Sequence, residues 1–369
     1  MHGLIIWAQS SCRSTMGLYA EVRKQLDVPV LIALWHYQDS CCDIRAAVGH
    51  DKDEFAGLPT INVGEDLFRG MEVLDSHPGY THIFAVYQSS RVWRELAIEA
   101  KRRGERVIIA SEAPCNMSSG IRHILKEVYM RYVLPHKVKD VVRCADLFLN
   151  FSGNDDKYAK LIGWSEDKIV PFGYFPPPVK NSHLRIRTTN RPFTILATGI
   201  LSRYRGADIL VEALRILSAR GVAYKATITQ NGELHDALKR KANKYSLPIE
   251  FPGFIAMDSL IHLYETCSVY VGAGRHEPWG MRLNDALNCG APLVVSTGMG
   301  GAKLVRDHGC GLCFENKSPN ALADALQSLA SDEELYVSCA KNVSSAVNAL
   351  APQTKASELI SLLKKRILG

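Results

Sequence analysis

VYVGAGRHEPWGMRLNDALNCGAPLVVS, residues 269–296, is the stretch that decides the fold. It starts with a short apolar run, and Pro278 and Gly280 then interrupt the chain just before an apolar-periodic segment. Gly290 and Pro292 end that segment, and a second apolar run follows. This order predicts a strand, a loop, a helix and another strand, which is one turn of a parallel α/β sheet. In such sheets ligands bind where strands end and the next helices begin.

Two acids and two backbone amides make this stretch a candidate ligand site. Glu277 lies in the predicted loop, and Asp285 lies about one and a half turns into the predicted helix over 280–288. The N–H groups of Gly280 and Met281, at the positive end of the helix dipole, suit a phosphate. Carboxylates beside an anion site suit the hydroxyl groups of a sugar or a ribose. An ordinary βα connection with two solvated acids fits the spacing equally well.

The composition describes a globular chain with room for two domains. Its 369 residues are 47% hydrophobic and 22% charged, and no apolar run is long enough to span a membrane. The run at 4–8 follows no basic leader and is interpreted as a strand rather than a signal peptide. Ten cysteines without a regular framework predict reduced thiols in a cytosol. Cys310-Gly-Leu-Cys313 lacks a second ligand pair and is interpreted as part of a buried strand.

The net charge of +6 is unevenly distributed. Residues 1–176 contain 21 Lys+Arg against 22 Asp+Glu, whereas residues 177–369 contain 23 against 16. The excess in the second half suits an anionic ligand there. No basic stripe with interleaved aromatic residues occurs, so we expect no nucleic-acid partner.

Strand and helix patterns alternate in both halves of the chain, which predicts doubly wound parallel sheets. We expect an N-terminal Rossmann-like domain over 1–175, a proline-rich linker over 176–191 and a second domain over 192–350. We expect a last helix over 351–369, which could pack back against the first domain. The predicted architecture is α/β, with two facing Rossmann-like domains and a cleft between them.

Several segments of the second half, taken in order, resemble a known family. They are Thr198-Gly-Ile-Leu-Ser-Arg-Tyr-Arg-Gly206, Gln230-Asn-Gly-Glu-Leu234, Phe251-Pro-Gly-Phe-Ile255, Arg275–Gly290 and the glycine turns near 300 and 309. Their order over about residues 192–330 is similar to that of retaining GT-B glycosyltransferases of family 4, the glycosyl transferases group 1. The first half matches mainly by architecture, as expected where acceptor binding diverges.

The resemblance implies roles for charged residues of the second half. Arg205 stands where the family has Lys, and a guanidinium can hold a diphosphate bidentately. Position 200, usually Arg, is Ile here, and Arg203 in the same loop could replace that cation. Glu277 matches the acid that accepts donor-sugar hydroxyls, and Asp285 stands for the Glu that holds the ribose. As alternatives, the arginines could be solvated loop residues and Glu277 could pair with Arg275.

The remaining donor contacts come from backbone groups. In the family pattern, Gly280 and Met281 offer amides to the diphosphate, and Gly253, Phe254 and Ile255 line the base. The implied reaction is transfer of a sugar, of the hexosyl type, from a nucleotide diphosphate to an acceptor hydroxyl with retained anomeric configuration. Fixed cations and dipoles would stabilise the leaving diphosphate, so no metal and no cofactor beyond the nucleotide-sugar co-substrate are expected. Asp51-Lys-Asp53 has a metal-binding spacing but follows no strand, and is discounted.

The first domain is expected to contact the acceptor, which would be a carbohydrate, a lipid-linked molecule or a small molecule. Glu112 follows the predicted strand over 107–110, where many family members place a His, and is the candidate proton acceptor. Alternatively, Glu112 is an acid that precedes a helix and has no part in catalysis. Ser11 and Arg13, after the first strand, are further acceptor-side candidates.

Residues 120–143 alternate basic and apolar residues over a predicted helix. One apolar face packed on the core is the favoured interpretation, and docking on an anionic bilayer is the alternative. We accordingly expect a cytoplasmic protein, with peripheral contact at the inner face of the plasma membrane left open. The pathways considered are polysaccharide, glycolipid or small-glycoside biosynthesis.

Two other functions compete. A non-catalytic GT-B-like scaffold that partners an active transferase would explain Ile200 and Asp285. A dinucleotide oxidoreductase is disfavoured because no Gly-x-Gly-x-x-Gly follows the first strand of either half.

Overall fold

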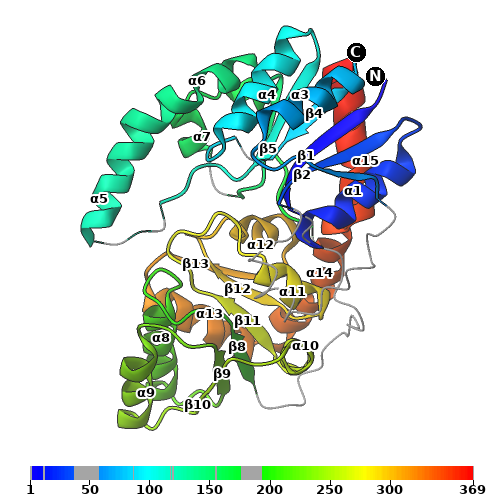
Figure 1. Ribbon diagram of the computed structural model, residues 1–369. Helices are drawn as coiled ribbons and strands as arrows, with labels where there is room; N and C mark the ends of the chain where they lie inside the picture. The colour runs from blue at the N-terminus through cyan, green and yellow to red at the C-terminus, as the bar shows by residue number, and fades with distance from the viewer. Residues whose placement is uncertain are drawn as a thin grey trace. The chain divides into compact units, whose positions relative to one another are not determined.

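The computed structural model describes residues 2–10, 13–36, 58–85, 87–116, 118, 120–153, 156–175 and 193–368. They form two compact units, one comprising 1–177 with 350–369 and the other comprising 178–349 (Figure 1). The predicted linker over 176–191 lies outside the described residues.

Unit 1 is built on a seven-stranded sheet of order β3-β2-β1-β4-β5-β6-β7, in which every pairing is parallel. Its strands are β1 (Leu4–Ser10), β2 (Val30–His36), β3 (Thr60–Asn62), β4 (Thr81–Phe84), β5 (Arg106–Ser111), β6 (Leu147–Asn150) and β7 (Ile169–Pro171). Every residue of the central strand β4 and of β6 is buried, because helices cover both sides of a parallel sheet.

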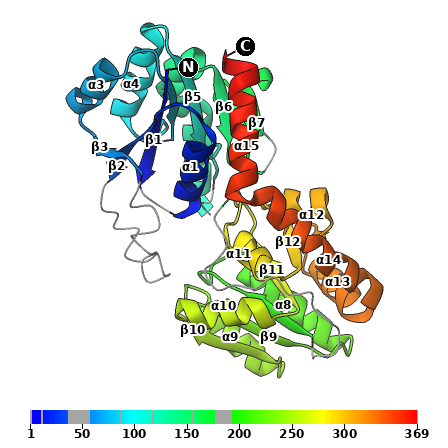
Figure 2. The ribbon, with the colours of Figure 1, turned by 90° about the vertical axis from the view of Figure 1, so that its right-hand side faces the viewer.

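The helices of unit 1 lie on the two faces of this sheet. They are α1 (Arg13–Gln25), α3 (Leu67–Ser76), α4 (Arg91–Arg102), α5 (Gly120–Val128), α6 (Leu134–Cys144), α7 (Lys157–Leu161) and α15 (Pro352–Leu363), with the 3-10 turn η2 (Glu166–Lys168) and the π-helical turns η1 (Tyr129–Val133) and η3 (Lys364–Leu368). On one face the α15 residues Ala356, Leu359 and Leu363 join a core with α1. The C-terminal helix therefore lies alongside α1, as Figure 2 also shows.

Unit 2 is a six-stranded parallel sheet of order β10-β9-β8-β11-β12-β13. Its strands are β8 (Thr194–Ala197), β9 (Lys225–Thr229), β10 (Ile249–Gly253), β11 (Val269–Gly272), β12 (Leu293–Ser296) and β13 (Gly311–Phe314). Strands β8 and β11 are far apart in sequence but adjacent in the sheet, with Val269 beside Ile195 and Tyr270 beside Leu196. The strand order reverses at this pair, and ligands bind at such points in doubly wound sheets.

The helices of unit 2 again cover both faces of its sheet. They are α8 (Ala207–Ala219), α9 (His235–Lys244), α10 (Met257–Thr266), α11 (Arg282–Asn288), α12 (Ala302–His308), α13 (Pro319–Ser331) and α14 (Glu333–Leu350). Residues of α8, α9, α13 and α14 share one core with β8, β9 and β11. Two Rossmann-like parallel-sheet units are therefore present, and the predicted fold class is confirmed.

The helical region over 120–143 differs from the favoured prediction. Met130, Leu134, Val138 and Val141 are buried against unit 1, so α6 packs on the core as expected. The apolar residues of α5 and η1 are exposed instead, by 38% to 69%: Ile121, Ile124, Leu125, Val128, Tyr129, Tyr132 and Val133. The packed-face interpretation is thus wrong for these seven residues, because no element of the described chain covers them at this end, which extends from the body of unit 1 in Figure 1.

The start of α8 depends on a glycine. Gly206 has a φ of +72°, and a Cβ atom built there would lie 1.9 Å from the carbonyl oxygen of Ala273. The turn before α8 therefore approaches the end of β11 more closely than any side chain would permit. This contact brings the loop over 198–206 against the loop that follows β11.

We predict that Gly206→Ala destabilises the protein much more than Gly221→Ala. Both glycines have a left-handed φ, of +72° and +74°, but nothing lies within 4 Å of a Cβ at Gly221. The control should lower the free energy of unfolding by about 1 kcal/mol through backbone strain. The clash at Gly206 should add about 1–3 kcal/mol. Urea unfolding measures both values, and equal losses would contradict the close approach.

Candidate functional site

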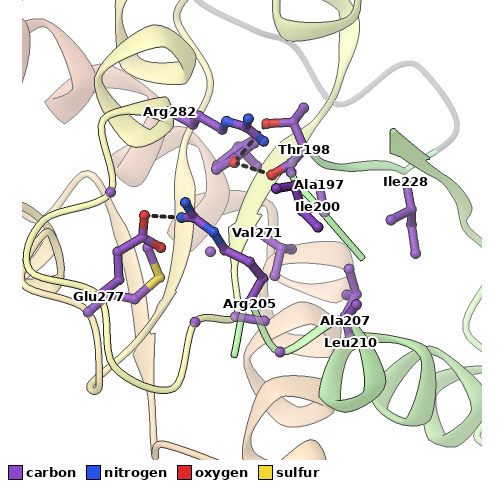
Figure 3. A pocket seen from close by; sticks show the side chains of 18 of the residues that line it. Ala197, Thr198, Ile200, Arg205, Ala207, Leu210, Ile228, Val271, Glu277 and Arg282 are labelled. Atoms are coloured by element: carbon purple, nitrogen blue, oxygen red, sulfur yellow. Dashed lines mark hydrogen bonds and ion pairs between the residues drawn. The ribbon is translucent and has the colours of Figure 1, made fainter. Parts of the chain in front are cut away.

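The candidate site is a small cavity at the carboxyl ends of β8 and β11 in unit 2 (Figure 3). The loop after β8 contributes Thr198, Gly199 and Arg205, and the segment after β11 contributes Glu277 and Arg282. The cavity has a volume of about 50 Å³, whereas complete sites for small molecules measure roughly 300–1,000 Å³. This cavity alone can therefore hold one small group of a ligand, such as a phosphate.

An ion pair between Arg205 and Glu277 joins the two loops (Figure 3). The Glu277 side chain is 11% exposed and that of Arg205 is 32% exposed, so the pair is largely shielded from water. Burial alone would lower the pKa of Arg205, but the Glu277 carboxylate outweighs it and raises that pKa above its ordinary value. The guanidinium also stacks on the Tyr204 ring, 4.8 Å from the ring centroid.

The backbone around Glu277 is held by the next loop of the sheet. The Glu277 N–H donates to the carbonyl of Gly298 at 3.2 Å, and the Gly300 N–H donates to the carbonyl of Glu277 at 2.8 Å. Trp279 is buried, and its Nε1–H donates to Asn284 Oδ1 at 2.7 Å. The position of Glu277 is thus set by two backbone hydrogen bonds to the loop that follows β12.

Arg275 does not pair with Glu277, which was one alternative for this acid. Its guanidinium instead donates twice to the Asp208 carboxylate, at 2.8 Å each, in a bidentate pair. Arg275 Nη1 also donates to the carbonyl of Arg203. This second link between the two loops leaves Arg205 as the cation that contacts Glu277.

The helix expected over 280–288 begins later, at Arg282. Gly280 has a φ of +100°, a conformation outside the right-handed helix, and Met281 is the N-cap residue. Gly280 lines the cavity, whereas Met281 is not among its lining residues. The predicted start of the helix is therefore wrong, because Gly280 turns the chain before the helix forms.

A cluster of hydroxyl groups adjoins the cavity, which Thr198 and Tyr270 line. Thr198 Oγ1 forms hydrogen bonds with the hydroxyls of Tyr264 and Tyr270, at 3.1 and 3.0 Å. Burial raises the pKa of both phenols, that of Tyr264 well above its ordinary value. Both tyrosines therefore stay neutral and add no negative charge to the cavity.

Arg282 is a cavity residue that the sequence reasoning missed. It is the first residue of α11, and its Nη1 atom is buried with no hydrogen-bond partner among the described residues. A usable signal was present in the sequence, since a cation is disfavoured at the N-terminal end of a helix unless it has another function.

The other predicted donor residues do not line this cavity. Arg203 is exposed, and its N–H donates to Glu233 Oε1 at 3.3 Å. Gly253, with a φ of +74°, ends β10 beside β9, and Phe254 after it is 62% exposed. Neither these residues nor Ile255 and Asp285 are among the lining residues. Asp285 lies in the first turn of α11, close enough for its carboxylate to influence the pKa of Tyr264.

The acceptor-side candidates belong to unit 1. Glu112 follows β5, and its Oε1 accepts a hydrogen bond from the Tyr174 hydroxyl at 3.1 Å. Its backbone carbonyl accepts from Gln88 Nε2 at 2.8 Å, so the side chain and the backbone of Glu112 are each held by one hydrogen bond. Arg13 begins α1. Ser11, like Asp51-Lys-Asp53, lies outside the described residues.

The cysteine pair at β13 is structural, with Cys310 just before the strand and Cys313 within it. Burial raises the pKa of Cys310 to about 12, and its thiol lies 3.7 Å from the carbonyl of Leu304. The Cys313 thiol faces a different carbonyl, that of Ala302, at 3.5 Å. Over the ranges that the structure describes, every cysteine is free and no group of three metal-ligating side chains occurs. The buried-strand interpretation of this pair is confirmed.

The two parallel-sheet units define the GT-B class of fold, and comparison with known proteins gives the same class. Residues 181–345 match the family model described as Glycosyl transferases group 1. The GDP-mannose-dependent alpha-(1-6)-phosphatidylinositol dimannoside mannosyltransferase of Mycobacterium tuberculosis is 31% identical over 181 residues, or 47% of this chain and 46% of that protein. The chain thus spans about half the length of the curated relatives it matches. These matches support a glycosyltransferase of this group.

Solved structures resemble the whole chain. Anabaena Alr3699/HepE, in complex with UDP and glucose, aligns with a TM-score of 0.67 and 15% identity over 98% of this chain and 99% of that chain. TarM aligns with a TM-score of 0.68 and 9% identity over 99% of each chain. At such low identity the likeness establishes the fold alone. Among the described residues, no helix combines the length and the apolar character needed to cross a membrane.

We predict a measurable coupling between Arg205 and Glu277 in protein stability. A double-mutant cycle of Arg205→Met and Glu277→Gln should give about 1–3 kcal/mol, because the pair is largely shielded from water. The control cycle uses Arg220 and Asp324, which form an ion pair at 2.7 Å with side chains 34% and 63% exposed. That cycle should give less than about 1 kcal/mol. Equal coupling energies from denaturant unfolding would contradict the description of the Arg205–Glu277 pair.

Proposed function

We propose that this protein is a retaining glycosyltransferase that moves a sugar from a nucleotide diphosphate to an acceptor hydroxyl. The observation that carries the proposal is the junction of Arg205 with Glu277 at the ends of β8 and β11. It combines a cation for a phosphate with a carboxylate for hydroxyl groups, the two chemistries that a sugar nucleotide presents together. The family match over 181–345 includes both residues and supports the proposal.

The proposed chemistry rests on charge stabilisation. As the glycosidic bond to the phosphate breaks, negative charge develops on the leaving diphosphate, and a guanidinium already in place stabilises it. Glu277 would accept hydroxyl hydrogen bonds from the donor sugar and hold it in position. With no protein nucleophile assigned, the departing phosphate would take the proton of the acceptor hydroxyl on the same face of the sugar, which retains the configuration. A fixed cation serves in place of a divalent metal in this scheme.

The relatives suggest which donors to test first. The mycobacterial relative is named for GDP-mannose, and the Anabaena structure holds UDP and glucose. Asp285, Arg203, Gly280, Met281 and the segment Gly253-Phe-Ile255 stay as proposed contacts for the rest of the donor. Glu112 stays as the proposed acceptor-side base, and Ser11 and Arg13, which follow β1 in the sequence, stay as proposed acceptor-side contacts. Polysaccharide, glycolipid or small-glycoside synthesis in the cytoplasm is the proposed setting.

We predict that Glu277→Ala and Arg205→Ala each reduce sugar transfer at least about 100-fold, because each removes a group that acts on the reacting donor. Turnover of UDP- and GDP-sugars is followed in the presence of EDTA, and proton NMR should find the anomeric configuration of the donor in the product. Arg240→Ala, at an exposed position in α9, is the control and should keep wild-type turnover. Wild-type turnover in either site variant would refute the site. Absence of any donor-dependent turnover, with the nucleotide still bound, would favour the scaffold function instead.

We also propose peripheral membrane contact through α5 and η1. Ile121, Ile124, Leu125 and Val128 follow a helical spacing, so their exposed side chains share one face of α5. Arg122, Lys126 and Arg131 add positive charge to the same segment. Exposed apolar residues flanked by basic ones suit the interface of an anionic bilayer, where a lipid-linked acceptor would lie.

We predict that the protein co-sediments with vesicles of phosphatidylcholine and phosphatidylglycerol and much less with pure phosphatidylcholine. The double substitution Ile124→Ser with Leu125→Ser should abolish most of this binding, because it removes apolar area from the interface. Phe68→Ser is the matched control, since Phe68 is 72% exposed but lies on α3. Equal binding of all three proteins would refute contact through this face.

A further inference from the structure

Arg282 is the least satisfied charged group of the cavity. Its Nη1 atom is buried, and no described residue accepts a hydrogen bond from it. Within the described chain, Arg282 also forms no ion pair with a carboxylate. Burying such a donor without a partner is unfavourable, so an arrangement of this kind normally has a functional reason.

Close packing holds this guanidinium against the loop after β8. A Cβ atom at Gly199 would lie 2.6 Å from Arg282 Nη1, so the absence of a side chain there provides the space that Nη1 occupies. Figure 3 shows the Arg282 side chain extending toward Thr198, on the opposite side of the cavity from Ala207. The loop beside it is uncharged at Thr198, Gly199 and Ile200, so Arg282 supplies the positive charge in this part of the site.

The charges of the cavity do not balance. Arg205 is paired with Glu277, and the buried tyrosines 264 and 270 stay neutral. The positive charge of Arg282 therefore has no matching carboxylate among the residues that line the cavity, where Arg205 is already paired. A small anion with several acceptor oxygens, with a volume suited to a cavity of about 50 Å³, would satisfy both arginines.

We infer that Arg282 is a phosphate-binding residue, which holds one phosphate of the nucleoside diphosphate together with Arg205. This inference rests on the proposed function and extends it, because it names the second cation of the donor site. The guanidinium donates its Nη1–H to a phosphate oxygen, and the same contact removes the unsatisfied group from the ligand-free protein. No bond forms or breaks at Arg282 itself.

Isothermal titration calorimetry tests the assignment with UDP, GDP, the nucleosides uridine and guanosine, and inorganic pyrophosphate. Arg282→Met should lower the affinity for whichever diphosphate the wild type binds, UDP or GDP, by about 10- to 100-fold. Nucleoside affinity should stay unchanged, because nucleosides carry no phosphate. Arg282→Lys should lose less of this affinity, since lysine keeps the positive charge but not the planar pair of N–H donors. Arg240→Met is the control for removing an exposed arginine.

A second readout separates binding from structural support. Removal of a guanidinium whose Nη1 is buried and unsatisfied should leave the Tm of the ligand-free protein unchanged or raise it, while the Tm increase caused by the diphosphate shrinks. A lower Tm without ligand, together with equal losses for nucleoside and diphosphate, would mean a structural arginine and overturn the inference. Unchanged diphosphate affinity in Arg282→Met would overturn it as well, with the proposed function intact.

Failure of the proposed function has a different signature. In that case the wild type binds neither UDP nor GDP. Pyrophosphate then distinguishes the sources of the phosphate: binding by the wild type that Arg282→Met loses would support a phosphate site for another ligand. If the wild type binds no pyrophosphate either, the assignment of Arg282 falls too.

Discussion

The parallel pairing of β8 with β11 is the constraint on which the site depends. It places the carboxyl ends of two strands that are far apart in sequence at one edge of the sheet, so the loops that follow them must meet. Gly206 lets those loops touch at the carbonyl of Ala273. The Arg205–Glu277 and Arg275–Asp208 pairs then link them by charge. One backbone pairing thereby brings together the groups assigned to phosphate and sugar.

The cavity contains stabilising and destabilising features side by side. Glu277 is held through its backbone, and the Tyr264–Thr198–Tyr270 hydroxyls satisfy one another. The Nη1 atom of Arg282, by contrast, is buried without an acceptor among the described residues. Binding sites commonly trade stability for function in this way, because a group that is satisfied before the ligand arrives gains little from the ligand. The distribution of satisfied and unsatisfied groups thus points to an anion.

Sequence patterns were sufficient for the fold because apolar runs between glycine and proline turns report parallel strands directly, as at β11 and β12. They also singled out Glu277 and Arg205, which lie at motif positions and which the structure brings together in one cavity. They were insufficient for Arg282, because a cation at a helix N-terminus is a weak signal, whereas the space beside Gly199 and the lack of a partner for Nη1 exist only in three dimensions. The start of α11 was misplaced because a left-handed glycine looks like an ordinary helix breaker in sequence. The exposure of α5 was misjudged because periodicity identifies an apolar face but not what covers it.

A crystal structure with bound UDP or GDP would test the central claim most directly. We predict that the diphosphate lies at the ends of β8 and β11, with its oxygens within hydrogen-bond distance of the guanidinium groups of Arg205 and Arg282. Glu277 should stay at the same end of the cavity, available to the sugar. A nucleotide bound elsewhere on the protein, with neither arginine touching a phosphate, would contradict the account.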